Sequence, residues 1–496
     1  MSFLHSISEY FRSRGSFRVQ IVLFLCLLVM TFFIRRFGWM GVLFFGGVLP
    51  GILFVLYFFH FPRAWIYMIF IAAYLIMGFS KYIQGPWGIV MDGLLGIFWT
   101  FLLLRGTLGL VQWNRANNLM TWLAIVWFLY LVLQLFNPLA PGRQSWIYGV
   151  RGLGLYFLFA STLSILVFDQ QKGWVNIVTI WGILSLFAAL KAFGQKYIGF
   201  DPYEYRWLYD VGARTHLLSS GIRYFSIFTD AGQFGASMGH SGTVFFILFL
   251  NERKIRRRIF YFLVFSTAFW AMGMSGTRGA IAVPMVGLVS YVILCKNFRL
   301  LLLGSFLLIA SFVFFRYTMI GQGYYEIRRM RSAFFPTQDA SLSVRMENQK
   351  KLAVYLQDKP FGTGLGTAGA NGARFYPDTF VATIPPDSWY VLIWAETGIV
   401  GLLFYLSMMF VILAYGSLLV LFKIRDKQIN NLLIAFISGG AGILVASYGN
   451  AVVGQFPTNI LYTITISYIF VAKRLDATSA IKALPPPTTA QSSDDV

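Results

Sequence analysis

Residues 388–422 read SWYVLIWAETGIVGLLFYLSMMFVILAYGSLLVLF, an apolar run in which Glu396 is the one charged residue. A helix that crosses a bilayer needs roughly 20 mostly apolar residues, so this run is long enough to span a membrane as a tilted or broken helix. Comparable runs recur along the chain, which is 57% hydrophobic and only 12% charged. The sequence therefore predicts an all-α, polytopic integral membrane protein.

The apolar runs together predict about fourteen transmembrane helices, with a range of about twelve to fourteen, each near the usual span length. The candidate spans are residues 19–34, 37–59, 64–80, 88–111, 117–136, 150–168, 174–194, 226–250, 259–274, 279–295, 298–316, 388–422, 430–449 and 454–472. The expected organisation is N-terminal helices in 1–200, central helices in 201–316, one large periplasmic loop in 317–387, C-terminal helices in 388–474 and a disordered cytoplasmic tail in 475–496.

Basic residues in short connecting loops predict the orientation of the chain, because such loops are usually cytoplasmic. The basic segments that fall on one side are NERKIRRR at 251–258, KIRDK at 423–427 and Lys473-Arg474. The loops 195–225 and 317–387 are then expected to face the periplasm from a bacterial inner membrane. Arg35-Arg36 does not fit this scheme.

The net charge of +21 is scattered over short loops between apolar runs, so it does not indicate a nucleic-acid partner. Cys26, Cys295 and the four histidines lack the spacing of metal ligands, so neither a metal nor another cofactor is expected. His240, near the middle of a predicted span, is expected to be a core residue.

The large loop 317–387 is rich in cations on the predicted outer side, where positive charge is usually scarce. Its basic residues are Arg328, Arg329, Arg331, Arg345, Lys350, Lys351, Lys359 and Arg374. An anionic ligand, such as the diphosphate of a lipid-linked sugar, would account for this concentration of positive charge.

Ionisable residues of the predicted spans gather toward the outer ends of those spans. They are Asp92, Arg151, Lys191, Asp230, Arg278 and Glu396. A secondary transporter usually has its binding groups near the middle of the bilayer. Clustering at one face instead favours an enzyme whose site lies at the outer membrane surface.

Three stretches carry residues suited to a phosphate-containing substrate. Arg223 lies in GIRYFSIFTDAGQFG at 221–235, and Arg278 lies in SGTRGA at 275–280. Arginine suits phosphate because its planar guanidinium donates two parallel hydrogen bonds and keeps its charge. The third stretch contains Arg345, KPFGTGLG at 359–366, PPDSWY at 385–390 and ETG at 396–398.

In this order, the motifs resemble those of the O-antigen ligase and Wzy-type O-antigen polymerase superfamily of bacterial envelopes. The matching elements are an arginine that enters a span (Arg223), an SxSRG-like motif (SGTRG, with Arg278), an outer-loop arginine followed by P-x-G-x-G-x-G (Arg345, PFGTGLG) and a helix that opens with ETGIVG (Glu396). The resemblance covers about residues 220–405 and implies a GT-C-like membrane fold.

The resemblance also implies a metal-independent glycosyl transfer from a glycan on undecaprenyl diphosphate to a sugar hydroxyl. Arg223 and Arg278 would hold the diphosphate and stabilise its charge as the sugar–phosphate bond breaks. Ligases of this superfamily commonly carry a histidine where this chain has Asp387, so Asp387 is the candidate general base, with Glu396 as the second catalytic carboxylate. The expected substrate-binding residues are Arg345, Lys359, Gly364, Gly366, Trp389 and Tyr390.

Polymerisation of lipid-linked repeat units, as in O-antigen, capsule or exopolysaccharide assembly, is the preferred function. One alternative is an O-antigen ligase whose acceptor is lipid A-core, and another is a flippase or exporter of lipid-linked oligosaccharides. The partners expected of a polymerase are the undecaprenyl-diphosphate-linked donor, a glycan acceptor, membrane lipid, a flippase and a chain-length regulator.

Each candidate also has a structural interpretation. Arg223 and Arg278 can anchor at lipid headgroups, and GTGLG can be a plain turn in which glycine permits positive φ. Asp387 can cap the helix that follows it. Glu396 can pair with a neighbouring arginine.

Overall fold

The computed structural model describes residues 31–32, 35–36, 38–83, 85–218, 221–296, 298–335 and 340–482. Within these residues almost all regular structure is helical. One short antiparallel pair, β1 (Leu217–Leu218) and β2 (Gly221–Ile222), places Leu217 opposite Ile222. The predicted all-α class is confirmed.

The chain divides into two units, residues 1–65 and 66–496. The first unit contains α3 (Trp39–His60), and Trp65 in this unit donates its indole N–H to the carbonyl of Phe58. The candidate functional residues all belong to the second unit. The first predicted span, 19–34, lies almost entirely outside the described residues.

Seven helices in the described part of the chain are long and apolar enough to cross a bilayer. They are α4 (Arg63–Tyr82), α5 (Trp87–Thr107), α6 (Leu119–Leu133) with its 3-10 extension η2 (Gln134–Phe136), the run α7 (Gln144–Val150), η3 (Arg151–Leu155) and α8 (Tyr156–Val167), α9 (Gln171–Tyr197), α20 (Trp389–Phe422) and α21 (Lys427–Ala446). This confirms a polytopic membrane protein, whereas the count of about fourteen spans, each of roughly 20 residues, stays a prediction.

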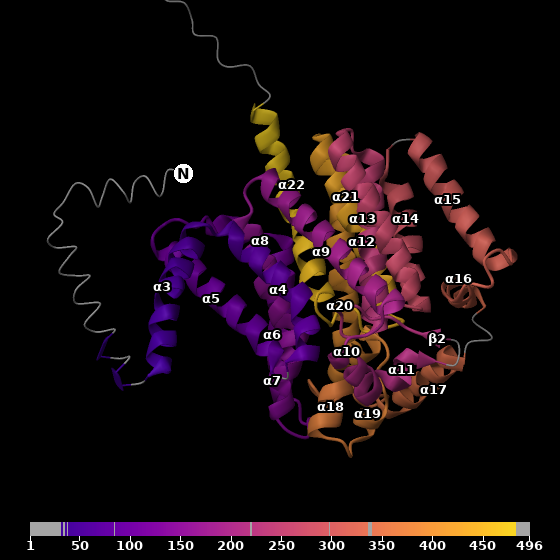
Figure 1. The fold of residues 1–496 in the computed structure, drawn as a ribbon, viewed down its shortest axis with the longest axis horizontal. Helices are drawn as coiled ribbons and strands as arrows, with labels where there is room; N and C mark the ends of the chain where they lie inside the picture. The colour runs from indigo at the N-terminus through magenta and orange to yellow at the C-terminus, as the bar shows by residue number, and fades with distance from the viewer. Residues whose placement is uncertain are drawn as a thin grey trace, which may run out of the picture. The chain divides into compact units, whose positions relative to one another are not determined.

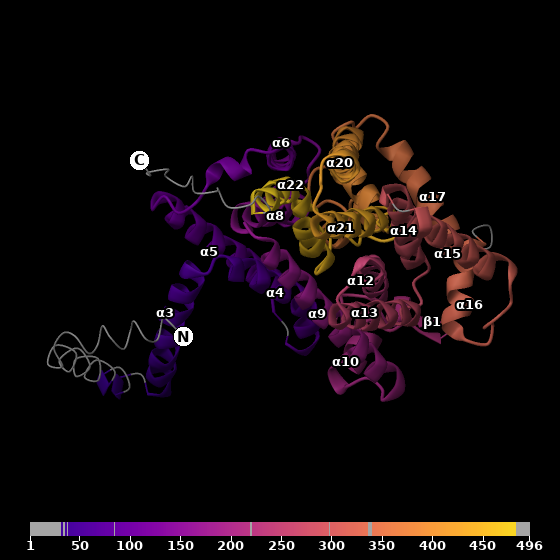
Figure 2. The same ribbon diagram turned by 90° about the horizontal axis from the view of Figure 1, so that it is seen from above.

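Further helices pack beside these in the second unit (Figures 1 and 2). They are α12 (Ala231–Asn251), α13 (Ile255–Met274), α14 (Ala282–Leu294), α15 (Phe298–Tyr317) and α22 (Thr458–Lys482). α12 packs against α9, α13, α14 and α21, and its His240 is fully buried with its ring 4.9 Å from that of Trp181. His240 therefore lies in the core, as expected.

The loops predicted to share one side do lie together, at what we call the loop end. Lys196, near the end of α9, forms an ion pair with Glu326 of the large loop, and Arg329 donates to the carbonyl of Gly276 at 3.2 Å. The basic segments that connect helices lie at the opposite end of the bundle. There Arg474 donates to the carbonyl of Phe168 at 2.8 Å.

Most of the segment predicted as a large loop is helical. It contains α16 (Tyr325–Arg331), η6 (Ser332–Phe334), α17 (Ala340–Tyr355), α18 (Gly369–Phe375) and α19 (Phe380–Thr383). The second unit also contains the short helices η1 (Trp113–Ala116), α10 (Pro202–Trp207), η4 (Leu208–Gly212), α11 (Ala213–His216) and η5 (Arg278–Ile281). Figure 1 shows α10, α11, α17, α18 and α19 gathered at the loop end.

The long run 388–422 was expected to form either a tilted or a broken helix, and it forms a broken one. Gly398 has φ 70° and ψ −174° inside α20, so the helical path is interrupted there. A Cβ at Gly398 would lie 2.0 Å from the carbonyl oxygen of Pro360, which shows how closely the large loop approaches this break.

At the other end of the C-terminal region, α22 continues to Lys482, into the segment predicted as a disordered tail. Residues 483–496 lie outside the described residues.

Candidate active site

Arg223 joins three parts of the loop end through its guanidinium. Its Nη1 donates to the carbonyl of Thr215 at 2.9 Å, its Nη2 to the hydroxyl of Thr277 at 2.8 Å and its Nε to the carbonyl of Ser275 at 3.2 Å. Because these bonds connect α11 with the SGT turn that follows α13, Arg223 has a clear structural role beside any role in binding.

Two further arginines lie close to Arg223. Burial lowers the pKa of Arg223, and the nearby positive charges of Arg329 and Arg278 lower it further. Arg329 donates from Nε to the carbonyl of Gly276, and Gly276 has φ 57°. We call Arg223, Arg278 and Arg329 the arginine cluster. Its convergence of positive charge around one turn suits an anion such as a diphosphate.

The start of α12 faces this cluster and is held by two side chains. Asp230 caps the helix by accepting the N–H of Gln233 at 2.9 Å. His216 Nε2 accepts the N–H of Ala231 at 3.0 Å, while its Nδ1 lies 3.0 Å from the carbonyl of Gly212. Burial lowers the pKa of His216 to about 4. The imidazole is therefore neutral near pH 7, as an acceptor at Nε2 requires.

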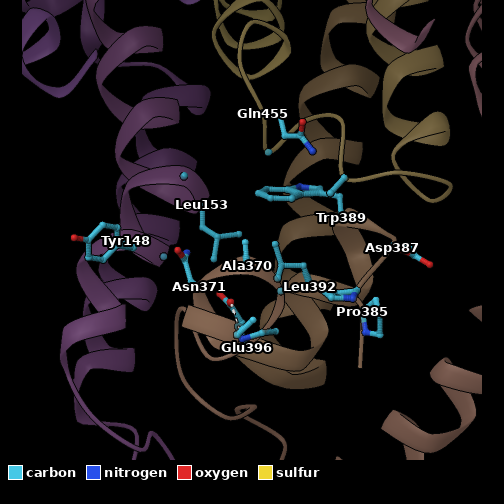
Figure 3. Close-up of a pocket in the computed structure, with 18 of the residues that line it drawn as sticks. Tyr148, Leu153, Ala370, Asn371, Pro385, Asp387, Trp389, Leu392, Glu396 and Gln455 are labelled. Atoms are coloured by element: carbon cyan, nitrogen blue, oxygen red, sulfur yellow. Dashed lines mark hydrogen bonds between the residues drawn. The ribbon is translucent and has the colours of Figure 1, made fainter. Parts of the chain in front are cut away.

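A cavity of about 570 Å³ lies at the loop end between α7, η3, α18, α20 and the connection from α21 to α22 (Figure 3). We call it the loop-end cavity. Its polar and aromatic lining includes Tyr148, Asn371, Asp387, Trp389, Glu396 and Gln455. This size is within the usual range for small-molecule sites.

Asp387 lies at the margin of the loop-end cavity, and its carboxylate points away from the other labelled residues (Figure 3). It accepts from Arg345 Nε of α17 at 3.4 Å, and both side chains are partly exposed. The helix cap of α20 is Ser388, whose hydroxyl accepts the N–H of Tyr390 at 3.2 Å. The alternative in which Asp387 caps this helix is therefore wrong.

Glu396 is buried at 2% exposure and lines the loop-end cavity. Its carboxylate accepts the N–H of Ala368 at 3.3 Å, and its carbonyl accepts the N–H of Gly364 at 3.0 Å. Glu396 thus holds the glycine-rich segment against α20 by accepting hydrogen bonds from backbone N–H groups. This contact differs from the expected ion pair between Glu396 and a neighbouring arginine.

The glycines of the PFGTGLG segment allow close packing. Gly364 and Gly366 have φ of 95° and 72°; added Cβ atoms would lie 2.6 Å from the Cβ of Ala140 and 2.4 Å from the carbonyl oxygen of Ser145. Lys359, at the start of the segment, donates to the carbonyl of Tyr355 at 2.8 Å. This geometry favours a packed turn over an open phosphate cradle.

The two aromatic candidates differ in position. Trp389 lines the loop-end cavity, and its indole donates to the hydroxyl of Tyr405 at 3.0 Å. Tyr390 donates its hydroxyl to the carbonyl of Leu444 in α21 at 2.6 Å. Trp389 is therefore the one of the pair that is placed to contact a ligand in the cavity.

Several charged groups at the outer ends of spans form ion pairs. Arg151 Nε lies 3.1 Å from Asp92, and Lys191 Nζ lies 3.0 Å from Glu204. These pairs connect helices, which accounts structurally for part of the charge clustering seen in the sequence. In the part of the chain that the structure describes, no three His, Cys, Asp or Glu side chains gather as metal ligands would.

The connection 447–457, between α21 and α22, reaches both candidate regions and was not predicted as part of the site. A Cβ at Gly232 would lie 2.0 Å from the amide nitrogen of Asn450 and 2.8 Å from the carboxylate of Asp230, so Asn450 approaches the arginine cluster. Gln455 lines the loop-end cavity, and its carbonyl accepts from Gln233 at 3.3 Å. The only signal was a short polar interruption between two apolar runs.

Fold and site together define an all-α polytopic membrane protein with an arginine cluster and a cavity at one end. Residues 263–406 match the Wzy_C family model, described as O-Antigen ligase. The match confirms the resemblance to the O-antigen ligase and Wzy superfamily and supports a ligase- or polymerase-type activity. It includes Arg278, Arg345, Asp387 and Glu396, whereas Arg223 precedes it. No curated protein matches the chain.

Proposed function

We propose that this protein polymerises undecaprenyl-diphosphate-linked oligosaccharide repeat units at the periplasmic face of the bacterial inner membrane. The observation that carries the proposal is the arginine cluster at the same end of the bundle as the loop-end cavity, with the 447–457 connection reaching both. The cluster suits a diphosphate, and the cavity, lined by Trp389 and polar groups, suits a sugar.

In the proposed reaction, an acceptor sugar hydroxyl attacks the anomeric carbon of the donor. The bond between that carbon and the diphosphate oxygen breaks, and the lipid diphosphate leaves. Arg278 and Arg329, with Arg223 behind them, stabilise the negative charge that develops on the leaving group. Asp387 takes the proton of the acceptor hydroxyl as general base.

Arg345 is the ion-pair partner of Asp387. Its guanidinium, 3.4 Å from Asp387, orients the carboxylate at the margin of the cavity. The same helix, α17, reaches the 447–457 connection, where the hydroxyl of Tyr448 donates to Gln349 at 3.2 Å. Asp387 is thus linked through α17 to the connection that approaches the arginine cluster.

An O-antigen ligase that transfers the glycan to lipid A-core is the second candidate, because the family description names that activity. A deletion strain separates the two. Loss of a polymerase should leave single repeat units on undecaprenyl diphosphate, whereas loss of a ligase should leave full-length lipid-linked polymer. Extraction of the lipid-linked glycans and measurement of their chain length checks this, and accumulation of polymer would overturn the polymerase assignment.

The proposed periplasmic orientation predicts which end of the bundle reacts with an impermeant thiol reagent. We expect Asp378→Cys, at an exposed site of the large loop, to be labelled in cells with a permeabilised outer membrane and an intact inner membrane. Arg253→Cys, exposed at the opposite end, is the matched control and should react only after lysis. Both variants are made in a background without Cys26 and Cys295. The reverse pattern would place the loop end in the cytoplasm.

A further inference from the structure

The turn between Arg223 and the start of α12 contains a backbone conformation that is unusual for its residue. Ser226 has φ 51°, and in the part of the chain that the structure describes it is the one non-glycine residue with positive φ. A Cβ disfavours this left-handed region, so such a conformation persists only where the surrounding contacts fix it. Ser226 lies between Arg223 and Asp230, the cap of α12, so its conformation sets how Arg223 is placed.

The side-chain amide of Gln195, near the end of α9, binds both backbone polar groups of Ser226. Its Oε1 accepts the N–H of Ser226 at 2.9 Å, and its Nε2 donates to the carbonyl of Ser226 at 3.4 Å. Gln195 and Ser226 are both buried. The hydroxyl of Ser226 donates to the carbonyl of Ala188, also on α9, at 2.7 Å. α9 therefore fixes the turn through three hydrogen bonds.

Glu204 of α10 orients the amide of Gln195. Its carboxylate accepts from Gln195 Nε2 at 2.8 Å, which leaves Oε1 to face the N–H of Ser226. Glu204 is 1% exposed, and its charge is paired with Lys191 of α9 at 3.0 Å. An ionised carboxylate can only accept, whereas an amide donates at one end and accepts at the other. Glu204, Gln195 and Ser226 are thus complementary in one orientation of the amide.

Buried contacts connect the Ser226 turn with the backbone of Arg223. The ring of Phe225 is fully buried, 4.6 Å from that of Trp207 on α10 and 5.4 Å from that of His216. The N–H of Arg223 donates to the carbonyl of His216 at 3.0 Å. A displacement of Ser226 is therefore transmitted to Arg223 through Phe225.

We propose that Gln195 and Glu204 are positioning residues, which act through the Ser226 turn to hold Arg223 in the arginine cluster. This inference rests on the proposed function for the role of Arg223. Gln195 and Glu204 are themselves buried and bound to Ser226 and Lys191, so they act on the ligand only through Arg223. Their contribution is preorganisation: the backbone that carries the guanidinium is already in place when the ligand arrives, which reduces the ordering that binding has to supply.

Binding of inorganic pyrophosphate to the purified full-length protein tests this inference without any glycan transfer. Gln195→Met keeps a side chain of similar length and leaves the N–H of Ser226 without its acceptor. We expect the affinity to fall by about tenfold, the usual effect of leaving one buried polar group unsatisfied. The reason is that a smaller fraction of the molecules holds the turn in the binding conformation.

The paired exchange of Gln195→Glu with Glu204→Gln is the rescue variant. It keeps a carboxylate that accepts the N–H of Ser226, an amide that donates to this carboxylate, and one negative charge beside Lys191, which is four residues away on α9. It should bind pyrophosphate nearly as well as the wild type. Asp210→Asn, at an exposed acidic residue of η4, is the matched control and should also bind normally. The exchange covers the case in which Gln195→Met does not fold: an exchange variant that accumulates in the membrane without binding pyrophosphate overturns the inference.

A double-mutant cycle with Arg223→Lys separates positioning of Arg223 from general support of the fold. Because Gln195 acts through Arg223, Gln195→Met should weaken pyrophosphate binding much less in the Arg223→Lys background than in the wild type. Equal losses in the two backgrounds, or undiminished binding by Gln195→Met, overturn the inference. Accumulation of polymer in the deletion strain would change the proposed reaction and leave these binding results standing.

Discussion

Replacing Arg278 with lysine should lower the rate of glycan polymerisation by about 10²–10³-fold, the usual cost of removing one group that stabilises charge in a transition state. Lysine keeps the positive charge and loses the planar fork that donates two parallel hydrogen bonds to phosphate. Because Arg278 is only partly buried beside the SGT turn, the protein should still accumulate in the membrane. Glycan chain length in cells and transfer rate in purified protein measure the effect.

Arg214→Lys is the matched control, since Arg214 is an exposed arginine of α11 at the same end of the bundle. It should produce normal glycan. Arg223→Lys is a less selective test, because Arg223 also holds Thr215, Ser275 and Thr277 in place. A normal glycan ladder from Arg278→Lys would return this residue to the headgroup-anchor interpretation.

The membrane fold could be predicted because bilayer spans leave a strong signal in composition. The run 388–422 was too long for a single straight span, and the structure places its break at Gly398. The helices of residues 317–387 were not predicted from the sequence. Most of these helices are short, and the longer α17 is only weakly amphipathic, so no apolar periodicity distinguished them from an irregular loop.

The sequence singled out Arg278 and Asp387 because each carries a charge at the edge of an apolar run, and their roles in the reaction stay predictions. Arg329 was recognised as one of many cations but not as a neighbour of Arg223, because their proximity depends on how α16 folds back onto the SGT turn. PFGTGLG supplied two candidate substrate-binding residues, Gly364 and Gly366, with a plain turn as the alternative interpretation. Only the contacts of Gly364 and Gly366 with Ala140 and Ser145 favour the packed turn.

Asp387→Asn should reduce glycan transfer by about 10²–10⁴-fold if the carboxylate acts as general base, which is the range that proton transfer by a positioned side chain contributes. Asparagine is nearly the same size and keeps an oxygen that can accept from Arg345. It cannot take a proton from the acceptor hydroxyl at neutral pH. Since Ser388 caps α20, the start of this helix should be unaffected. Transfer rate and binding of undecaprenyl diphosphate are measured on the same purified variant.

Binding of undecaprenyl diphosphate should survive in Asp387→Asn, because the diphosphate is assigned to the arginine cluster, so a selective loss of transfer separates chemistry from donor binding. Asp378→Asn, an exposed aspartate of the same segment, is the matched control and should retain normal activity. Normal transfer by Asp387→Asn would exclude Asp387 as the base. Glu396 would then be a poor substitute, because its buried carboxylate already accepts the N–H of Ala368. Stabilisation of the leaving diphosphate by the arginines would have to account for the catalysis.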